Sequence, residues 1–530
     1  MAAKRLDAIV IGGGPNGLAA ATRLAKRGRG VLLLEARPAL GGLSGRLEFH
    51  PGHAAPGVLH DDGRLSELAV DALGLAGHGL AFRDAPAVLV AEREGSGILL
   101  ERDDRATAAR LAERSARDGE AWIAYRAFFR RIAPFVGALM SSPPPPLSPT
   151  TIGDWARLAK RGLGLARLGR RDGVELARVA PMCVADYLNE RFTIPALVEA
   201  LAGPAVAGTW SGPWSAGTAT QLILHETAPA RRIVGGPAAL VAALERAARA
   251  AGVEIRTGTA VERIRIDGDG VRGVTLAGGE AIDATTVVAT CDPKRAMLAL
   301  AQPGTLPLAA EEEFRRIRSR GTAAKVHLAL DGPFELATRP GERLEEIRIG
   351  GGHVDDLERA FDAVKYRQVS TRPWLDVRVP SVDDPSLAAA GGATISVLVS
   401  FAPHQVEGGW TDERREALGN AVVARLEEHS PGLGARVVGG QVLTPQDLER
   451  DFHVTGGQLH HVEPALDQLF LLRPTPGAAR YATAVPGLYL GGAGSHGGGG
   501  VGCDAGVLAA EAALRTGAGG RLPRPDSSGR

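Results

Sequence analysis

The chain has 530 residues, a formal net charge of +1 at pH 7, and 45% hydrophobic and 23% charged residues. This balance is typical of a globular protein of two or more domains, and the near-neutral charge excludes a general attraction to nucleic acid. Three widely spaced cysteines, Cys183, Cys291 and Cys503, exclude a disulfide framework and favour a reducing compartment such as the cytoplasm. We find no secretory leader and no run of 18 apolar residues, so we expect no membrane-spanning segment.

The first 42 residues predict one dinucleotide-binding unit. An apolar strand at 8–11 runs directly into the sequence GGGPNG, a helix follows over 18–26, and a second buried strand at 31–34 ends on Glu35. In such a unit the first glycine allows a tight turn, the second lets backbone approach a pyrophosphate, and the third lets the helix pack on the strand. The helix N-terminus also attracts phosphate. We therefore expect a pyrophosphate site at Gly12, Gly14, Pro15, Asn16 and Gly17.

An acidic residue and a second pair of glycines select the nucleotide. Glu35 is placed to accept a hydrogen bond from a ribose hydroxyl, which disfavours NADP and leaves FAD and NAD. The following R-x-x-G-G element, from Arg37 to Gly42, is typical of two-domain FAD oxidoreductases. The expected contacts of this part of the cofactor are Glu35, Ala36, Arg37, Gly41, Gly42 and Leu43.

Two later segments return to the pattern of a nucleotide-binding domain. The middle segment contains a helix at 238–251, strands at 253–256 and 261–264, a hairpin through 267–276 and a buried strand at 286–290. Near the C-terminus, a strand at 487–490 enters a glycine-rich loop, and a helix runs from about 504 to 515. This second strand–loop–helix unit predicts another site where a helix N-terminus faces a negative group.

The nucleotide domain is therefore expected to be discontinuous. We assign 1–100, 226–304 and 476–516 to it, and 101–225 and 305–475 to a substrate domain, with a disordered tail at 517–530. The substrate domain should be mostly helical over 105–225, with strands at 325–330, 375–379 and 394–400 and a helix at 413–428 later on. A basic amphipathic stretch at 155–173, interrupted by Gly162 and Gly164, indicates either peripheral membrane contact or an ordinary solvated helix.

Six stretches resemble the bacterial phytoene desaturase family, in its phytoene-dehydrogenase-related branch. They are DAIVIGGGPNGLAAATRLAKRG, LLLEARPALGG, CVADYLNERF, DVRVPSVDDPSLA, ALDQLFLLRPTP and GLYLGGAGSHGGGGVGCDAG. The resemblance implies an α/β fold with two domains, an FAD-binding Rossmann-type domain and an α+β substrate domain, as in amine oxidases and GDP-dissociation inhibitors. It implies non-covalent FAD, with Val261 at the adenine and Gly494, Gly500 and Val501 facing the flavin.

The chemistry is less determined than the cofactor, because a flavin exchanges hydride with carbon without a protein nucleophile. We expect an FAD-dependent oxidoreductase acting on C–C or C=C bonds of a small hydrophobic, isoprenoid or polyene substrate, which enters a largely apolar tunnel between the domains. The alternatives are an FAD oxidase of C–N or C–O bonds and a non-enzymatic carrier of the GDP-dissociation-inhibitor type. The oligomeric state stays open.

His496 is the candidate for proton handling, although bracing of the glycine loop is the alternative that we favour. His60 is a second candidate for a position over the flavin, against a surface turn. Cys503, at a helix N-terminus, is a candidate redox thiol. The pair His460–His461 lacks companion ligands at metal spacing, so we expect no metal.

Overall fold

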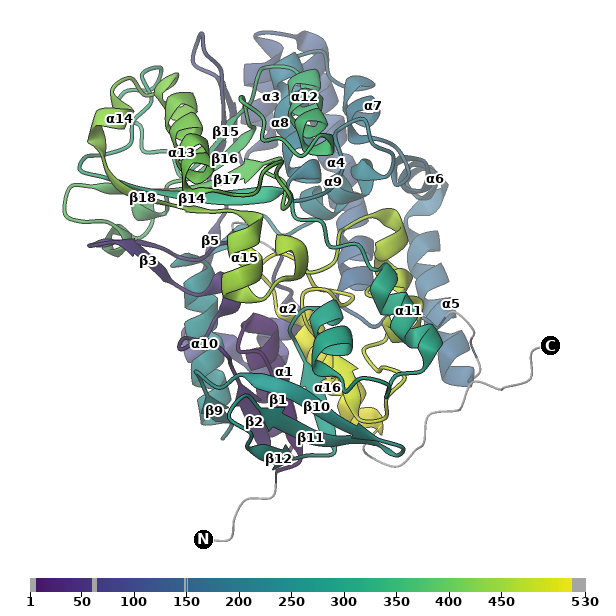
Figure 1. Ribbon diagram of the computed structural model, residues 1–530. Coiled ribbons are helices and arrows are strands. Elements are labelled where there is room, and N and C mark those ends of the chain that lie inside the picture. The colour runs from purple at the N-terminus through teal and green to yellow at the C-terminus, as the bar shows by residue number, and fades with distance from the viewer. Residues whose placement is uncertain (1–5, 60–63, 147–148, 150, 517–530) are drawn as a thin grey trace.

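A parallel sheet of five strands forms the lower part of the molecule in Figure 1. The computed structural model describes residues 6–59, 64–146, 149 and 151–516. The sheet order is β19 (Leu488–Leu490), β13 (Thr286–Ala289), β1 (Ala8–Ile11), β2 (Val31–Leu34) and β9 (Glu254–Arg256). Most of these strands are short apolar runs because both faces of the sheet are covered. The sheet thus brings together three separate parts of the chain.

Two different layers cover this sheet. One face packs on the helices α1 (Pro15–Lys26), α10 (Gly236–Ala250) and α16 (Asp504–Thr516). The other face packs on β10 (Val261–Asp267) and β11 (Gly270–Leu276), which form a smaller antiparallel sheet with β12 (Ala281–Asp283). The π-helical turn η3 (Arg295–Leu300) completes that side. The predicted hairpin and strands of the middle segment are confirmed.

A second, mixed sheet lies above the first in Figure 1. Its seven strands run in the order β18 (Val437–Leu443), β14 (Ala323–Leu330), β17 (Ala393–Ser400), β16 (Leu375–Arg378), β15 (Glu346–Ile349), β6 (Val88–Ala91) and β7 (Ile98–Leu100). The helix α13 (Asp412–Glu427) buries Leu418, Val422 and Leu426 against one face. The three strands and the helix that the sequence predicts here are confirmed within one or two residues.

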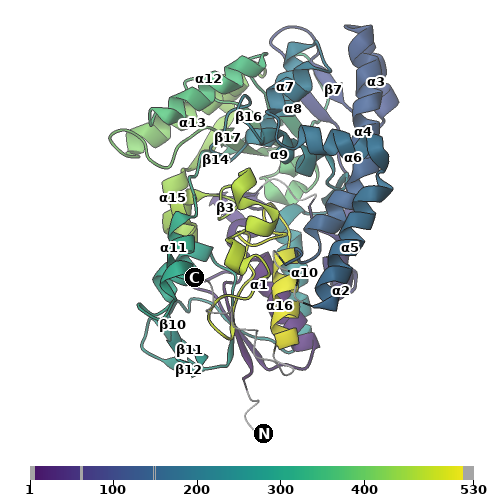
Figure 2. The ribbon, with the colours of Figure 1, turned by 90° about the vertical axis from the view of Figure 1, so that its right-hand side faces the viewer.

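Helices build the remaining side of the upper part, and α5 extends down beside the lower part, as Figure 2 shows. They are α3 (Asp104–Ala112), α4 (Ala116–Met140), α5 (Ile152–Arg167), α6 (Gly169–Val179), α7 (Val184–Asn189), α8 (Pro195–Val206), α9 (Thr218–Glu226) and α12 (Val354–Lys365). The predicted helical character of 105–225 is therefore confirmed. The expected interruption at Gly162 and Gly164 is wrong, because α5 runs through both, and the chain instead turns at Gly169, whose φ is +75°.

Short elements connect these layers. They are β3 (Leu47–His50), β4 (His53–Ala55), α2 (Glu67–Leu73), β5 (Phe82–Asp84), β8 (Arg231–Ile233), α11 (Leu308–Arg316), α14 (Leu433–Arg436) and α15 (Pro445–Phe452). None of the described helices is both long enough and apolar enough to cross a bilayer.

Two of the predicted domain boundaries need correction. The first segment was expected to stay in the nucleotide domain to residue 100, but β6 and β7 join the second sheet. The boundary at 305 is also displaced, because Phe314 and Ile317 pack in the core beneath the first sheet. In both places apolar side chains find a core in the other layer. The predicted tail at 517–530 lies outside the described residues.

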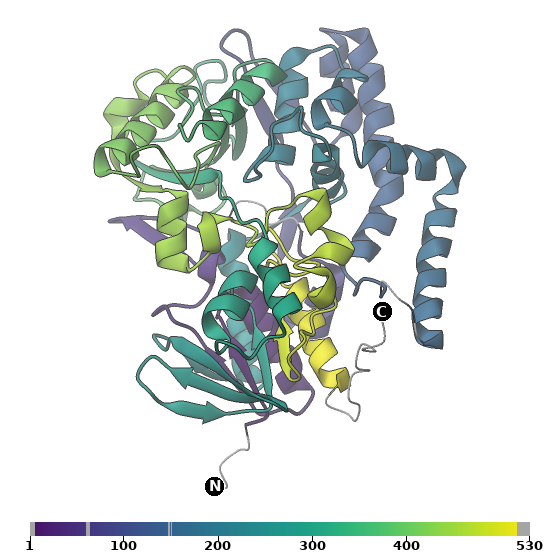
Figure 3. The ribbon, with the colours of Figure 1, turned by 45° about the vertical axis from the view of Figure 1, so that its right-hand side comes forward.

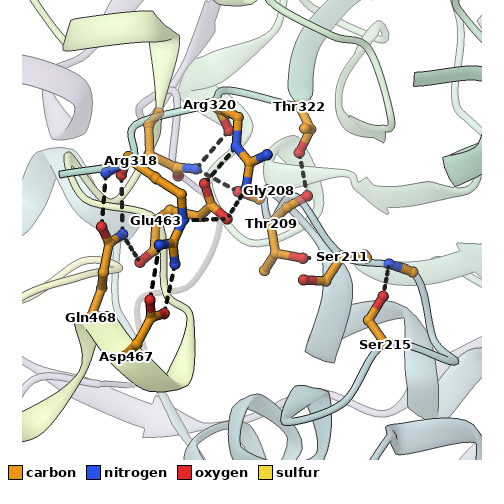
Figure 4. A network of polar contacts seen from close by, with 12 residues as sticks. Gly208, Thr209, Ser211, Ser215, Arg318, Arg320, Thr322, Glu463, Asp467 and Gln468 are labelled. Atoms are coloured by element: carbon orange, nitrogen blue, oxygen red, sulfur yellow. Dashed lines mark hydrogen bonds and ion pairs between the residues drawn. The ribbon is translucent and has the colours of Figure 1, made fainter. Parts of the chain in front are cut away.

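A polar network ties the segment entering β14 to the loop that follows α15 (Figure 4). The guanidinium of Arg320 donates to both carboxylate oxygens of Glu463, at 2.9 and 2.7 Å, and Arg318 pairs in the same way with Asp467. Gln468 exchanges hydrogen bonds with the backbone of Arg318. Bidentate charged pairs of this kind fix orientation as well as distance. They hold the loop at 458–468 where it borders the cavities described next.

Candidate functional site

The loop between β1 and α1 has the close packing that its glycines predict. Gly12 has a φ of +104°. A Cβ atom on Gly17 would lie 1.8 Å from the carbonyl oxygen of Gly12, so only glycine lets α1 approach the strand this closely. The start of α1 then borders a cavity, which we call the nucleotide cavity, and Pro15, Asn16 and Gly17 form part of its wall.

Glu35 directly follows β2, lines the same cavity and is 8% exposed. One carboxylate oxygen accepts a hydrogen bond from the Gly13 amide at 2.6 Å, and the other accepts from the Arg37 amide at 2.8 Å. Each oxygen keeps a lone pair for a further donor. The carboxylate is therefore held in place by backbone and remains able to accept a ribose hydroxyl.

The second glycine pair faces the first loop. Gly41 donates its amide hydrogen to the Gly13 carbonyl, and a Cβ on Gly42 would lie 3.6 Å from the Cα of Gly14. Arg37 stacks over the ring of Phe452, 4.2 Å from its centroid. Both loops thus present bare backbone across a cavity that side chains would fill, which is the shape that a pyrophosphate requires.

Most of the predicted cofactor contacts line this one cavity. They are Gly12, Gly14, Pro15, Asn16, Gly17, Glu35, Ala36, Arg37, Gly42, Leu43, Val261 and Gly500. Gly41, Gly494 and Val501 do not line it. Gly41 braces Gly13 from behind, Gly494 packs against Pro293 and Val462, and Val501 is fully buried in the core beside α16.

Sequence reasoning missed several residues of the same wall. They are Ser44, Thr259, Thr290, Cys291, Arg295, Ala493 and Gly502. Arg295 is the notable omission, because it adds a positive charge at the start of η3. Asp292 accepts hydrogen bonds from the amides of Lys294 and Arg295, and burial raises its pKa to about 6. The Asp-Pro helix start was visible in the sequence and could have indicated this position.

The C-terminal unit closes on the N-terminal one. Gly506 in α16 would bring a Cβ within 2.0 Å of the Asn16 carbonyl, and its amide donates to the Asn16 side chain at 3.0 Å. The two ends of the chain therefore pack helix to helix without an intervening side chain. The side chain of Asn16 holds α16 in this contact, while the residue also borders the cavity.

His496 is a buried brace in this structure. Its Nε2 atom lies 2.9 Å from the carbonyl oxygen of Leu139 and 3.1 Å from that of Ser142, at the end of α4. Burial lowers the pKa of His496 to about 4, so the ring is neutral at pH 7. It lines neither the nucleotide cavity nor the one beside it. The proton-handling role therefore lacks geometric support, because the ring points to backbone carbonyls.

The other candidates give no reactive group. Cys503 is fully buried, and burial raises its thiol pKa well above the usual value, which corrects the expectation of a low pKa at the helix N-terminus. No group of described His, Cys, Asp or Glu residues has an arrangement that could hold a metal ion. His60 lies outside the described residues.

A second cavity, of about 410 Å³, adjoins the nucleotide cavity and shares Leu59, Leu459 and Gly500 with it. Its wall differs from the largely apolar tunnel that we expected. Aliphatic side chains alternate with charged ones, and Trp122 is the single aromatic residue among the described lining residues. The charged lining residues are Arg64, Arg102, Arg126, Arg130, Arg232, Arg348 and Arg378, with Glu101, Glu226 and Asp376. The charges come from elements far apart in the sequence, which periodicity alone does not bring together.

Comparison with known proteins identifies the class. Residues 204–514 match the family of flavin containing amine oxidoreductases, and residues 10–64 match an NAD(P)-binding Rossmann-like domain. The chain belongs to the flavin containing amine oxidoreductase family, and the predicted two-domain FAD-binding fold is confirmed.

Individual relatives resemble the chain at low sequence identity. The chain is 29% identical to pyridine nucleotide-disulfide oxidoreductase domain-containing protein 2 of Rattus norvegicus, over 96% of this chain and 93% of that protein. It is 30% identical to a zeta-carotene-forming phytoene desaturase of Myxococcus xanthus, over 46% of each. Among solved structures, a putrescine oxidase superposes with a TM-score of 0.53 at 16% identity, covering 97% of this chain and 99% of that chain.

A cyclohexylamine oxidase of Brevibacterium oxydans superposes with a TM-score of 0.54 at 17% identity, covering 96% of this chain and 98% of that chain.

The sequence similarity to phytoene desaturases confirms the relation that the six matching stretches indicated. The cofactor is FAD, and the bare-backbone cavity with Glu35 at its edge fits that nucleotide.

We expect Glu35→Ala to weaken FAD binding about ten- to a hundredfold, because a hydrogen bond to a charged group contributes about 1.5–3 kcal/mol. Titration of apoprotein with FAD measures the change. Glu254→Ala, on the neighbouring strand β9 and largely exposed, is the matched control and should bind FAD normally. Unchanged FAD affinity in Glu35→Ala would show that this carboxylate does not hold the ribose.

We expect His496→Gln to loosen FAD while leaving the rate of flavin reduction at saturating FAD within a few fold. Between pH 6.5 and 4 the unfolded chain binds a proton that the folded His496 does not, so its contribution lowers stability as pH falls through this window. We expect the variant to melt at a lower temperature than the wild type at pH 7.5. The difference should become smaller at pH 5, because only the wild type loses stability through His496. A rate loss of roughly 10²–10⁴-fold with intact FAD affinity would instead assign proton transfer to His496.

Proposed function

We propose that this protein is an FAD-dependent oxidoreductase that acts on C–C or C=C bonds of a hydrophobic substrate, by desaturation, saturation or isomerisation. The observation that carries the proposal is the second cavity, which adjoins the nucleotide cavity and shares Leu59, Leu459 and Gly500 with it. Aliphatic side chains such as Val58, Leu201 and Leu398 line its interior. The similarity to phytoene desaturases supports the same bond type.

FAD supplies a two-electron carrier when it is bound. The residues of the chain bind and orient the reactants. Glu35 and the two glycine loops hold the nucleotide, and Leu59 and Leu459 provide an apolar boundary where the two cavities meet. The described wall of the substrate cavity contains no residue to which we assign a proton transfer. This fits chemistry in which the protein acts through position and exclusion of water.

An oxidase of C–N bonds is the second candidate, because the superposed solved structures include putrescine and cyclohexylamine oxidases. The charge of the cavity opposes it. Seven arginines and three carboxylates line the wall. Glu346, Asp84 and Asp104, which lie outside the lining, pair with four of these arginines, so a small positive excess remains to oppose an ammonium substrate. Trp122 alone cannot form an aromatic cage for a cation. A non-enzymatic carrier is disfavoured by the complete nucleotide cavity.

The decisive experiment mixes the purified protein anaerobically with isoprenoid polyenes and, separately, with putrescine. We expect acid precipitation to release FAD, and we expect a polyene either to bleach the oxidised flavin or to reoxidise flavin reduced beforehand. Isomerisation would leave the flavin spectrum unchanged at the end and would appear as a new polyene isomer on chromatography. Reaction with putrescine alone would contradict the proposal, and a protein without redox-active FAD would favour a carrier.

We also propose that α5 rests on an anionic membrane surface. The helix stands at the outer edge of the molecule (Figures 1 and 3), where Ile152, Trp155 and Leu163 are 91%, 62% and 52% exposed. These three share one stripe at helical spacing, with the exposed Lys160 and Arg167 beside it. In the amphipathic stretch that the sequence indicates, Trp155 is exposed, whereas Leu158 and Leu168 are half-buried and Leu168 packs on the helical core. An exposed apolar stripe with flanking cations suits an interface of anionic lipid.

We expect the double substitution Lys160→Glu and Arg167→Glu to lower binding to phosphatidylglycerol vesicles at least tenfold, since each cation near such a surface contributes about 1 kcal/mol. Vesicle co-sedimentation measures this binding. The same reversal at Arg315 and Arg316, exposed on α11, is the control and should change it little. Equal binding of the wild type to vesicles of phosphatidylcholine alone, or no vesicle binding, would contradict the proposal.

A further inference from the structure

One face of the second sheet carries charged side chains on three of its strands. Arg348 on β15 lies directly opposite Asp376 on β16, and Glu346 lies directly opposite Arg378. Lys325 on β14 and Asp376 both pair with Leu398 of the strand between them, which places all of these residues in two adjacent rows. Directly opposed residues share a face of the sheet, so these charges all project to the same side.

The alternate residues of the same strands show why this face is unusual. Val326, Ile347 and Val377 belong to the apolar core that α13 covers. The charged residues must therefore point the other way, towards the helices α4, α8 and α9. Arg348, Asp376 and Arg378 are among the residues that line the cavity there.

Charge pairing on this wall is uneven. Glu346 is shared by Arg232, at 2.7 Å, and by Arg378. Asp376 lies 3.3 Å from Arg378. Its negative charge also attracts the buried Lys325 and partly opposes the lowering of the Lys325 pKa by burial. Arg126 forms its own ion pair with Glu226. The carboxylates of the wall are thus each engaged by another cation.

Arg348 is left without an ion pair among the described residues. Its guanidinium donates to the Ala200 carbonyl at 2.9 Å and lies 3.4 Å from Nε2 of His225, and the residue is only 6% exposed. Burial lowers the pKa of Arg348, and attraction from Asp376, Glu226 and Glu346, none of which forms an ion pair with it, offsets only part of this shift. A buried charge is costly unless a counter-charge accompanies it. The missing partner is therefore best supplied by a bound ligand.

We propose that Arg348 binds an anionic group, a carboxylate or a phosphate, on an otherwise apolar substrate. This inference rests on the proposed function and adds a recognition group to it. A guanidinium suits either anion because its planar fork donates two parallel hydrogen bonds. The apolar part of the substrate has room beside the aliphatic side chains of this cavity and in an adjoining cavity of about 550 Å³. That cavity shares Arg64 and Arg130 with the first and is lined by Val136, Met140 and Leu224.

Four probes with one alkyl chain test the proposal on the FAD-loaded protein: dodecanoate, dodecyl phosphate, dodecanol and dodecylammonium. Perturbation of the flavin absorbance by each probe gives its dissociation constant. We expect the preferred anion to bind the wild type about 10–100-fold more tightly than dodecanol, and dodecylammonium to bind more weakly than dodecanol. The tighter of the two anions identifies the natural group.

Variants then locate the contact. Arg348→Met should remove the preference for the anion over dodecanol, and Arg348→Lys should retain part of it. Arg359→Met, on the exposed surface of α12, is the control and should behave as the wild type. Equal affinity of the wild type for the anions and dodecanol would overturn the proposal, whether or not Arg348→Met folds. An anion preference that survives Arg348→Met in the folded holoprotein would overturn it as well.

The proposed function can fail separately. Anion-selective binding without any reaction of polyenes or their carboxylates would leave this inference standing and would remove the proposed C–C chemistry. Oxidation of neutral polyenes as fast as of their carboxylates, with no anion preference in binding, would do the reverse.

Discussion

The nucleotide site depends on close contacts between backbones that leave no space for a side chain. Gly17 brings α1 against the Gly12 carbonyl, and Gly506 brings α16 against the Asn16 carbonyl; any Cβ at either position would overlap backbone. The first contact sets the distance between the phosphate loop and the helix N-terminus. The second places the C-terminal glycine loop, with Gly500 and Gly502, on the same cavity. Two loops nearly 500 residues apart thus form one site because glycine permits this packing.

The second sheet is governed by an opposite constraint, the cost of burying charge. Its outer face is apolar and is satisfied by α13, whereas its inner face retains Lys325, Glu346, Arg348, Asp376 and Arg378. Such a face is stable only when each charge has a partner. One partner comes from β8, whose Arg232 pairs with Glu346 of the sheet. The contact that joins β8 to the second sheet therefore also neutralises part of the cavity wall.

The sequence predicts the first of these arrangements far better than the second. The phosphate loop, Glu35 and the second glycine pair lie within 31 residues, so their spacing alone determines the site. The cavity wall draws on strands from residue 88 to residue 398, and no local pattern gives their order. A signal was nevertheless present. The strands EIRI, LDVR and KVHL alternate charged or polar with apolar residues, and this period of two, in strands that both layers bury, indicates a charged internal face.

His496 and Arg348 show the difference between a residue that stands in a motif and one that the sheet register places at the cavity. A histidine in a glycine-rich loop draws attention by its position in the motif, yet burial and two carbonyl partners leave it neutral. Arg348 stands in no recognisable motif, and only the register of β15 against β16 shows that it faces the cavity. Its neighbours supply hydrogen bonds to the guanidinium, and the nearby carboxylates of Asp376, Glu226 and Glu346 attract it without forming an ion pair with it. An anionic head held there, with an alkyl chain along the aliphatic wall, would describe a membrane amphiphile, the kind of molecule that the exposed stripe of α5 would meet at a lipid surface.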